Sequence, residues 1–497
     1  MRPRSAVRAV NEPGGRQVGN EAKFYIDGRW TEPAEPLRTF AVVDPSTEAE
    51  AARVAAASAA DVDAAVAAAH RAFPAYSRTT REERLEMLVR LAEAYGRRMP
   101  SIAAAMTTEV GIPRGLAEGG QVHAGMTHLR TAAEALAEYP LEEDSGTTRI
   151  VREPVGVCAL LAPWNWPMNQ VTAKVAPALA AGCTMVLKPS RLAPLSALLF
   201  AEAVEEAGVP AGVFNLVNGA GAEVGPLLAG HPLVDMVSIT GSTAVGAQVA
   251  QAAAGSIKRV SQELGGKSAN IVFEDVDVDR VVAKGVLGCM HNSGQSCNAP
   301  TRMLVAEAVY ERAVEVATRV AGSVVVGDPR DTATFMGPVA GRKRYDTVRE
   351  YIEAGVAEGA RLVAGGPDRP AGLDKGFYVR PTVFADVTPG MRIAREEIFG
   401  PVLCVLPFRD EDHAVELAND SDYGLSGYVQ SADLERARRV AARLRTGMVH
   451  INGAPTDGRA PFGGYKQSGN GREWGRFGLE DYFEVKAVMG YRPRGAA

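Results

Sequence analysis

Between residues 155 and 240 the chain alternates short apolar segments with segments of helical periodicity, and this alternation restricts the fold more than any other feature of the sequence. The apolar segments VGVCALLAP, TMVLKPS, FNLVNG and MVSITGS are typical of buried strands. Helices are predicted between them near 169–181, 194–207 and 222–229. A βαβ series of this kind predicts a parallel sheet with right-handed crossovers, whose ligands bind beyond the carboxyl ends of the strands.

Similar alternation recurs between residues 269 and 440, where ANIVF, RMLV and PVLCVLPF are typical of strands and helices are predicted near 279–291, 309–321 and 410–419. We therefore predict two α/β domains, because 497 residues are too many for one hydrophobic core. Upstream, alternating apolar residues predict a β-hairpin formed by 24–30 with 40–50. Apolar residues at helical spacing predict helices over 61–73, 80–97 and 100–110.

The composition is that of an ordinary soluble protein, with 46% hydrophobic and 23% charged residues and a net charge of -5. This charge argues against nucleic acid or an anionic membrane surface as the main partner. The most apolar run, roughly 171–187, contains Lys174 and Gly182 and is shorter than the roughly 20 residues that a membrane span needs. No transmembrane segment is predicted.

Cysteine usage and the amino terminus indicate the compartment. Five cysteines stand at irregular, wide spacings without a CxxC pair, so neither a disulfide framework nor a metal site is predicted, and a reducing cytoplasm fits. The first twenty residues contain four arginines but no apolar segment, which excludes a secretory signal. We predict a disordered tail over 1–20; an organellar transit peptide is the alternative.

Cys297 lies in HNSGQSCNAPTR (291–302), a run of small and polar residues that leaves room for a substrate to approach. A cysteine becomes nucleophilic as the thiolate, so a catalytic thiol needs partial access to solvent and a neighbour that lowers its pKa or accepts its proton. The alternative that the local sequence leaves open is a buried structural thiol.

Two glycine-rich turns follow successive predicted strands, GAGAEVG (219–225) and TGSTAVG (240–246). Free backbone N–H groups at strand-to-helix turns attract phosphate, and two such turns in successive βα units favour a dinucleotide lying across them. Either turn alone could be a plain tight turn, since neither matches a Walker A loop or GxGxxG. Lys188, in VLKPS (186–190), stands at the carboxyl end of a predicted strand and is placed to bind a ribose or a phosphate, although a solvated lysine would have the same sequence.

Three further motifs place polar groups at strand ends or turns. Glu263 precedes a Gly-Gly turn in QELGGKSAN, and its apolar flanks favour a partially desolvated general base over a surface acid. Asn165, in PWNWP, could stabilise an oxyanion or cap a turn. Glu397 and Phe399, in EEIFGPV, could bind a sugar hydroxyl and form the wall beside a ring.

Taken together, PWNWP, KPS, TGSTAVG, ELGGK, GQSC, EEIFGPV and PFGGYKQSGNGRE resemble the aldehyde dehydrogenase superfamily, in the same order and with matching intervals, over residues 24 to 491. The resemblance implies an α/β fold with a Rossmann-type cofactor domain, a second α/β catalytic domain and a small β oligomerisation arm. The boundaries we expect are 21–140 with 155–263 for the cofactor domain, 264–465 for the catalytic domain, and 141–154 with 481–497 for the arm.

The resemblance also implies NAD(P)-dependent oxidation of an aldehyde to its carboxylic acid. Cys297 would attack the aldehyde carbon, Asn165 and the Cys297 backbone N–H would hold the oxyanion of the thiohemiacetal, and Glu263 would activate the water that hydrolyses the thioester. The residues implied in cofactor binding are Leu161, Trp164, Lys188, Ser190, Arg191, Gly221, Gly225, Gly241, Ser242, Val245, Leu264, Glu397 and Phe399. Those implied in substrate binding are Met168, Thr172, His291, Ser296, Asn298 and Phe462, with the loop 454–462.

One position departs from the family's pattern. Three residues after Lys188, where many NAD-preferring members have a glutamate that binds the adenosine ribose, this chain has Arg191. A glutamate repels a 2′-phosphate whereas an arginine can pair with it. We therefore predict NAD or NADP as cofactor, with NADP tolerated or preferred.

Other activities compete with this interpretation. A cysteine-dependent hydrolase could use His291 or His450 as base, but the glycine-rich turns would then have no purpose. CoA-acylating aldehyde dehydrogenases lack the base that Glu263 supplies, and a non-enzymatic protein on this fold would be expected to have lost Cys297 or Glu263.

Substrate and assembly are the least constrained features. No Arg or Lys is placed to clamp a substrate carboxylate, so a neutral aliphatic or aromatic aldehyde is favoured over a semialdehyde acid. Residues 141–153 and 481–491 alternate like exposed edge strands, and such strands pair readily with a neighbouring chain. With the habit of the family, they predict a homodimer or homotetramer.

Overall fold

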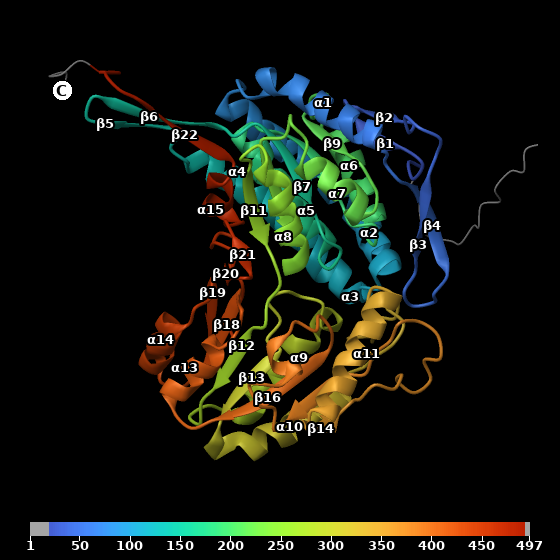
Figure 1. Ribbon diagram of the computed structural model, residues 1–497, viewed down its shortest axis with the longest axis vertical. Coiled ribbons are helices and arrows are strands. Elements are labelled where there is room, and N and C mark those ends of the chain that lie inside the picture. The colour runs from blue at the N-terminus through green and yellow to red at the C-terminus, as the bar shows by residue number, and fades with distance from the viewer. Residues whose placement is uncertain (1–18, 493–497) are drawn as a thin grey trace, which may run out of the picture.

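The computed structural model describes residues 19–492, so most of the predicted tail (1–18) and the end of the predicted arm (493–497) lie outside the described residues. Two α/β lobes are stacked along the long axis, and a narrow β arm projects from the upper one (Figure 1). The first lobe, drawn at the top, contains an eight-stranded sheet, and the second lobe contains a seven-stranded sheet. The predicted α/β fold class is confirmed.

The sheet of the first lobe has the order β2-β1-β9-β8-β7-β10-β11-β21. Its five central strands, β9 to β11, are parallel, as the βαβ pattern predicted, and antiparallel strands cover both edges. In chain order the strands are Phe24–Ile26 (β1), Arg29–Thr31 (β2), Val157–Leu161 (β7), Thr184–Lys188 (β8), Phe214–Leu216 (β9), Met236–Thr240 (β10), Arg259–Glu263 (β11) and Gly469–Asn470 (β21).

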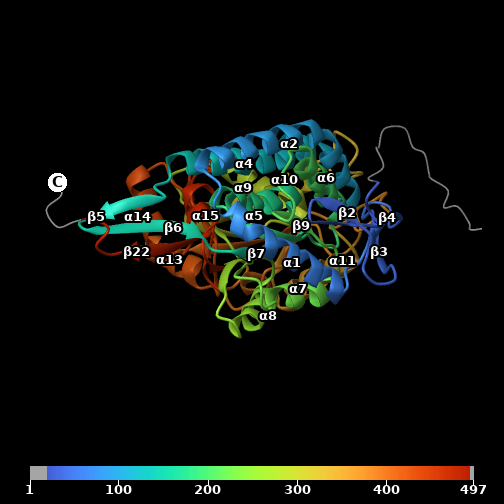
Figure 2. The ribbon, with the colours of Figure 1, turned by 90° about the horizontal axis from the view of Figure 1, so that it is seen from above.

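Alternate residues of the central strands face two different cores. Cys158 and Leu160 of β7 pack into one, and Val157 and Ala159 pack into the other. Because both faces are apolar, helices cover both sides of the sheet (Figure 2). One side is covered by α1 (Ala59–Tyr76), α7 (Gly221–Ala229) and α8 (Thr243–Ala254), and the other by α2 (Arg81–Val110), α4 (Val122–Glu138), α5 (Pro167–Ala181) and α6 (Pro194–Glu206).

Residues 81–110 form one helix, so the prediction of separate helices over 80–97 and 100–110 is wrong. Pro100 lies inside α2. A proline in a helix interior costs about 3 kcal/mol, but the buried side chains on both sides of it, among them Leu91 and Ile102, pack into one continuous core. Tertiary packing therefore outweighs the helix-breaking tendency of one residue.

The sheet of the second lobe has the order β14-β15-β16-β13-β12-β18-β19 and is parallel except for β14. Its strands are Ala269–Val272 (β12), Arg302–Ala306 (β13), Arg361–Ala364 (β14), Thr382–Ala385 (β15), Val402–Phe408 (β16), Ser426–Gln430 (β18) and Met448–Ile451 (β19). One face packs on α9 (Val278–Met290) and α10 (Tyr310–Ser323), and the other on α11 (Arg342–Ala357), α12 (Arg392–Arg395), α13 (Glu411–Asn419) and α14 (Leu434–Arg443).

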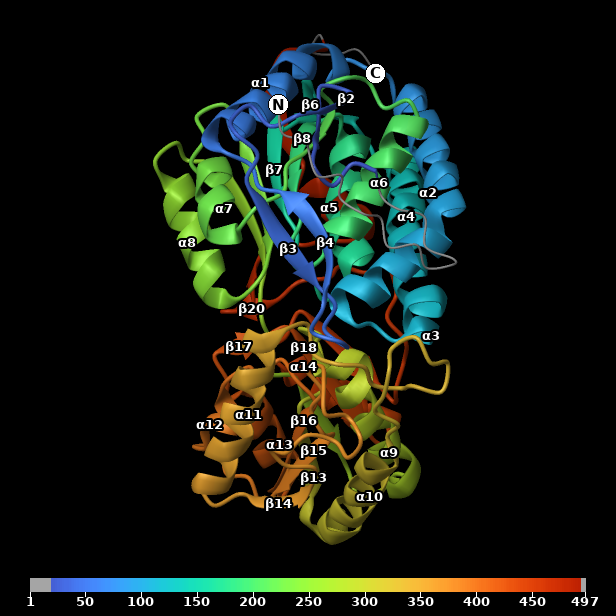
Figure 3. The same cartoon turned by 90° about the vertical axis from the view of Figure 1, so that its right-hand side faces the viewer.

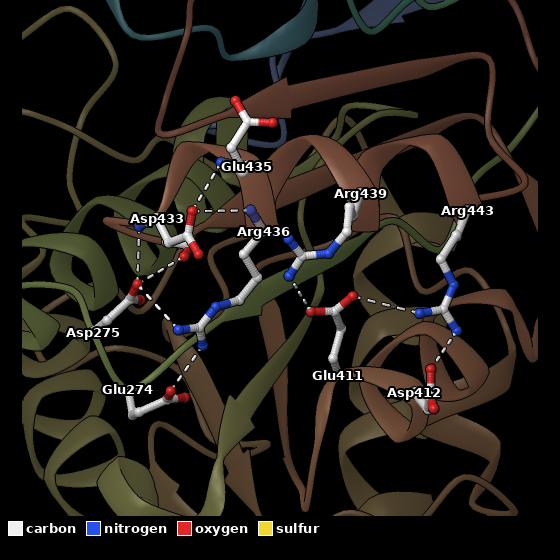
Figure 4. Close-up of polar contacts among 10 residues, drawn as sticks. Glu274, Asp275, Glu411, Asp412, Asp433, Glu435, Arg436, Arg439 and Arg443 are labelled. Carbon is white, nitrogen blue, oxygen red and sulfur yellow. Dashed lines mark hydrogen bonds and ion pairs between the residues drawn. The ribbon is translucent and has the colours of Figure 1, made fainter.

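The polar side of α14 is tied to its surroundings by ion pairs (Figure 4). Arg436 pairs with Glu274 at 2.8 Å, next to the end of β12, and Arg439 pairs with Glu411 of α13 at 3.1 Å. Each exposed pair adds little to stability. These arginines are nevertheless held by carboxylates, so the helix does not present a free basic face.

The arm is a three-stranded antiparallel sheet in the order β22-β6-β5, formed by Glu142–Ser145 (β5), Thr148–Pro154 (β6) and Phe483–Val488 (β22). The two segments predicted as edge strands therefore pair with each other, 329 residues apart at the Phe483 and Pro154 contact, and the outer edges of β5 and β22 remain. None of the helices in residues 19–492 is long and apolar enough to cross a membrane.

Smaller elements connect these units. The amino-terminal segments form two hairpins, β1 with β2, and Thr39–Val43 (β3) with Glu50–Ala55 (β4). The predicted single hairpin of 24–30 with 40–50 is therefore wrong in its pairing, although both segments are strands. The remaining short elements are α3 (Arg114–Leu116), η1 (Ala117–Gln121), η2 (His291–Gly294), η3 (Glu307–Val309), β17 (Tyr423–Gly424), β20 (Tyr465–Lys466) and α15 (Gly475–Glu480).

Candidate active site

The carboxyl ends of the first sheet bring the predicted cofactor motifs together. β7 ends at Leu161, β8 at Lys188 and β10 at Thr240, and a motif follows each strand. Two cavities open there and share Trp164, Thr240 and Gly241 in their walls. All thirteen residues implied in cofactor binding line one or both cavities.

The outer cavity, of about 510 Å³, suits an anionic ligand. Lys188 is buried in its wall, and among the residues that the structure describes its Nζ donates only to the neighbouring carbonyl of Pro189, at 2.9 Å. Burial, followed by the charge of Arg191, lowers the pKa of Lys188 to about 8. Gly221 and Gly225 add no side chain, so a ligand can reach the backbone at the start of α7. A second cation beside a buried ammonium is costly unless an anion binds between them.

The inner cavity, of about 220 Å³, joins both lobes. Cys297 and Asn165 line it together with Ser242, Leu264 and Glu397. Glu397 accepts a hydrogen bond from the backbone N–H of Gly266 at 2.9 Å, and burial raises its pKa to about 7. The motifs that the sequence predicted separately therefore surround one space.

Cys297 is carried by a loop of unusual backbone geometry. Asn292, Ser293 and Gly294 all have positive φ, at 53°, 56° and 70°. A Cβ on Gly294 would overlap the backbone of Gly400, so this position requires glycine. The nucleophile loop is thereby packed directly against the segment that follows Glu397.

The thiol of Cys297 is the most accessible in the chain. It is half-buried, whereas Cys158, Cys183, Cys289 and Cys404 are buried. Burial, with the nearby charges of Glu397 and Glu263, raises its pKa, and backbone N–H groups oppose this shift. The resting side chain is therefore a thiol, and it becomes a nucleophile only when it loses its proton.

Asn165 is held in place beside this thiol. Its side-chain Nδ2 donates to the backbone carbonyl of Gln295 at 3.0 Å, and its backbone carbonyl accepts from Nδ2 of Asn292 at 2.8 Å. An amide nitrogen has two N–H donors, so the second one is available to the cavity.

Glu263 ends β11 and is buried, and neither of its carboxylate oxygens has a hydrogen-bond partner in the described part of the chain. Burial raises its pKa well above the usual value, Glu473 raises it further, and the cations of Lys174 and Arg472 oppose the shift. The two residues that follow Glu263, Leu264 and Gly265, line the inner cavity together with Cys297, and the charge of Glu263 raises the pKa of that thiol, so the carboxylate lies near the thiol. A desolvated, unpartnered carboxylate of this kind is suited to general base catalysis.

Sequence reasoning missed the ion pair behind Glu263. Nζ of Lys174 lies 2.5 Å from Oε1 of Glu473 and 3.1 Å from Oγ of Ser238, and all three side chains are buried. The signal was a lysine inside the most apolar run of the chain, which demands a buried partner. Arg344 was missed as well; it lines the inner cavity, and its guanidinium lies 5.3 Å from the ring centroid of Phe399.

On the other side of the nucleophile loop lies a groove of about 610 Å³. Ser296 and Asn298, the neighbours of Cys297, line it with Trp166, His291 and Tyr428. Neither His291 nor His450 forms a hydrogen bond with Cys297 in the part of the chain described. Arg280 and Lys284 also line this groove, although the sequence predicted no Arg or Lys placed to clamp a substrate carboxylate. The groove therefore presents charged, polar and aromatic surface beside the neighbours of Cys297.

The structure does not bring every predicted substrate residue to this groove. Met168 and Thr172 are fully buried on α5, and the hydroxyl of Thr172 donates to the carbonyl of Met168 at 2.7 Å. Phe462 is buried against Trp474, with ring centroids 4.3 Å apart. None of the three lines the groove.

The fold and the site define an oxidoreductase that combines a dinucleotide cofactor with a cysteine nucleophile. A sequence model described as "Aldehyde dehydrogenase family" matches residues 30–488, and the chain belongs to this family. The predicted membership and the predicted NAD(P)-dependent aldehyde oxidation are confirmed.

Individual relatives support the assignment over nearly the whole chain. The 3-succinoylsemialdehyde-pyridine dehydrogenase of a Pseudomonas species is 54% identical over 470 residues, which are 94% of this chain and 98% of that protein. Aldehyde dehydrogenase C of Pseudomonas syringae, solved with NAD+ and octanal, has a TM-score of 0.95 and 52% identity, over 97% of this chain and 99% of that one. An aldehyde dehydrogenase from Bartonella henselae has a TM-score of 0.93 and 48% identity, over 95% and 99% of the two chains.

Proposed function

We propose that Cys297, Asn165 and Glu263 carry the aldehyde oxidation. Sγ of Cys297 bonds to the aldehyde carbon as the thiol proton passes to solvent water, and the carbonyl electrons move onto oxygen. The second Nδ2–H of Asn165 and the backbone N–H of Cys297 stabilise that oxyanion, because fixed donors in a water-poor site act where charge develops. NAD(P)+, when bound, accepts the hydride that leaves the same carbon. The acyl group remains on Cys297 as a thioester.

Glu263 is the single observation that most favours water as the acyl acceptor. A buried carboxylate with both oxygens free and a raised pKa can remove a proton from water near neutral pH. The hydroxide equivalent adds to the thioester, and the thiolate of Cys297 leaves. A CoA-acylating enzyme needs no base to activate water, because its acyl acceptor is a thiol, which loses its proton far more readily than water does.

For the cofactor we propose that NADP is accepted and preferred. Lys188 and Arg191 line the outer cavity, and none of the side chains that line it, all within the described chain, is Asp or Glu. Dinucleotide sites that select NAD commonly place an acid on the ribose 2′-hydroxyl, and an arginine there accommodates the 2′-phosphate. The relative from P. syringae was solved with NAD+, so use of NAD by this chain is compatible with the same cavity.

For the substrate we propose an aldehyde with a chain or ring of several carbons rather than one of two or three. The groove of about 610 Å³ is much larger than a small aldehyde requires, and its walls combine aromatic rings with amide and hydroxyl groups and with the charged side chains of Asp275, Asp277, Arg280 and Lys284. A semialdehyde-pyridine and octanal, which two relatives are named or solved with, are both of this size class. Tyr428 supports the wall by donating to the carbonyl of Asn298 at 2.9 Å.

We also propose that the first lobe is the cofactor domain, the second lobe the catalytic domain, and the arm an oligomerisation element. The outer edges of the arm sheet carry unpaired backbone groups, and such edges pair readily with a second copy of the chain. A homodimer or homotetramer would use them. Five unpaired thiols support a reducing cytoplasm as the compartment.

The test is a panel of aldehydes assayed with each cofactor and without CoA, with the absorbance of the reduced cofactor as readout. We expect stoichiometric acid and reduced cofactor, a higher kcat/KM for longer aldehydes than for acetaldehyde, and a higher kcat/KM with NADP than with NAD. Turnover that requires CoA would overturn the role of Glu263. A strong preference for NAD would overturn the cofactor proposal alone.

A further inference from the structure

Helix α11 begins with three consecutive cations, Arg342, Lys343 and Arg344, and has no acidic residue in its first turn. The amino end of a helix carries partial positive charge. A cation there therefore destabilises the helix, whereas an acidic side chain would stabilise it. The helix belongs to the second lobe and lies below α7 and α8 of the first lobe (Figure 3). Violations of a local rule of this kind concentrate at functional sites, where a ligand compensates for them.

Two of the three cations have partners within the protein. Arg342 pairs with Glu48 at 3.1 Å and lies 5.2 Å from the ring centroid of Phe377. Arg344 donates to the carbonyl of Ile398 at 3.1 Å and packs over Phe399 in the inner cavity. Lys343 has neither an ion pair nor a side-chain hydrogen bond with any part of residues 19–492, and it lines the outer cofactor cavity.

The surroundings of Lys343 lack a compensating acid. Among residues 19–492 it is the only one in the wall of the outer cavity that comes from outside 161–249, and it joins Lys188 and Arg191 there without any Asp or Glu. Thr240 also lines this cavity and is only 9% exposed, and its Oγ1 has no hydrogen-bond partner in the same described range. Arg191 and Lys343 are exposed whereas Lys188 is buried, and these three cations with an unpartnered hydroxyl suit a ligand with several anionic oxygens.

We propose that Lys343 is a specificity-determining residue for a 2′-phosphorylated dinucleotide. Its ammonium, from the second lobe, and the guanidinium of Arg191, from the first, contact the 2′-phosphate from opposite sides of the cleft. The pyrophosphate common to both cofactors carries about two negative charges, and the 2′-phosphate adds about one and a half to two more. The cofactor phosphate thus connects the two lobes. This inference rests on the proposed acceptance of NADP. It adds Lys343, which lies far in sequence from Lys188 and Arg191, to the residues that bind the cofactor.

Equilibrium binding tests this role without turnover. Trp164 lines the cavity, so its fluorescence reports binding of NADP or NAD to the full-length enzyme. We expect Lys343→Gln to weaken NADP binding about tenfold to a hundredfold, the range for a lost charge-assisted contact, and to change NAD binding by less than about threefold. Lys343→Arg should retain NADP affinity. Lys375→Gln, an exposed lysine outside the cavity, is the matched control and should change neither.

The outcomes separate the two levels of the proposal. If wild type binds NADP and Lys343→Gln leaves its affinity unchanged, or weakens NAD equally, the role of Lys343 is overturned and the cofactor proposal stands. If wild type fails to bind NADP, both are overturned. A double-mutant cycle with Arg191→Gln should show that the two substitutions weaken NADP binding by a factor different from the product of the single effects, because both cations contact one phosphate. A strictly multiplicative result would contradict a shared phosphate.

Discussion

Replacing Asn165 by alanine separates the structural role of this side chain from its proposed catalytic role. In the folded protein its Nδ2 donates one hydrogen bond of 3.0 Å to the carbonyl of Gln295, which keeps a second donor, Nδ2 of Asn292, at 3.3 Å. The loss in free energy of unfolding should therefore be about 0.5–1.5 kcal/mol. If the other N–H stabilises the oxyanion, the barrier to forming the thiohemiacetal from bound aldehyde rises by about 2.7–4 kcal/mol, a fall of about 10²–10³ in kcat when this step limits the rate.

The assay is single-turnover formation of reduced cofactor at saturating aldehyde, with urea unfolding of the same samples. Asn169→Ala is a matched control, because it removes the same amide from α5 and one hydrogen bond of similar length, 2.8 Å to Nε2 of His128, outside the inner cavity. We expect the two variants to lose similar stability and only Asn165→Ala to lose catalysis. Equal rates in the two variants would refute the reasoning.

Three further predictions address charge and backbone. Glu473→Gln removes a negative charge that raises the pKa of Glu263; since a base must be deprotonated to act, the acid limb of the kcat–pH profile should move to lower pH, and an unmoved limb would contradict this coupling. Cofactor affinity should weaken as pH rises above about 8, where Lys188 loses its charge, as titrations at several pH values would show. Gly294→Ala, at φ 70° against backbone, should lose about 2–5 kcal/mol of unfolding free energy in urea, whereas Gly255→Ala, with open space around it, should be close to neutral.

The sequence was most informative where strand ends carry motifs. Lys188, Thr240 and Glu263 each end a strand of one parallel sheet, so recognising the βαβ pattern was enough to place them along one edge. The loop of Cys297 was recognised for a different reason: its small and polar residues leave room for a substrate to approach the thiol. These placements depend on local order and on the general geometry of parallel sheets.

Other features depend on contacts that no local pattern encodes. Lys174 and Glu473 are 299 residues apart, and only the folded chain pairs them. Lys343 and Arg344 reach the cavities from a helix of the other lobe.

The orientation of α5 illustrates a second limit. Met168 and Thr172 share one helix face by their spacing, but nearly all residues of α5 are buried, so no apolar stripe distinguishes the face that meets the core from the face that meets a cavity. The prediction that these two residues line the substrate pocket had no amphipathic signal to orient it. In the structure both side chains are fully buried in the first lobe.

The most direct test of the account is the pre-steady-state release of reduced cofactor from Glu263→Gln and Cys297→Ala. If the thiol forms the acyl-enzyme and the carboxylate activates water, Glu263→Gln should form about one equivalent of reduced cofactor per site and then stall with acylated Cys297, which mass spectrometry of the intact chain would detect. Cys297→Ala should form none. Steady turnover of Glu263→Gln at the wild-type rate, or reduced cofactor from Cys297→Ala, would contradict the division of labour between this thiol and this carboxylate.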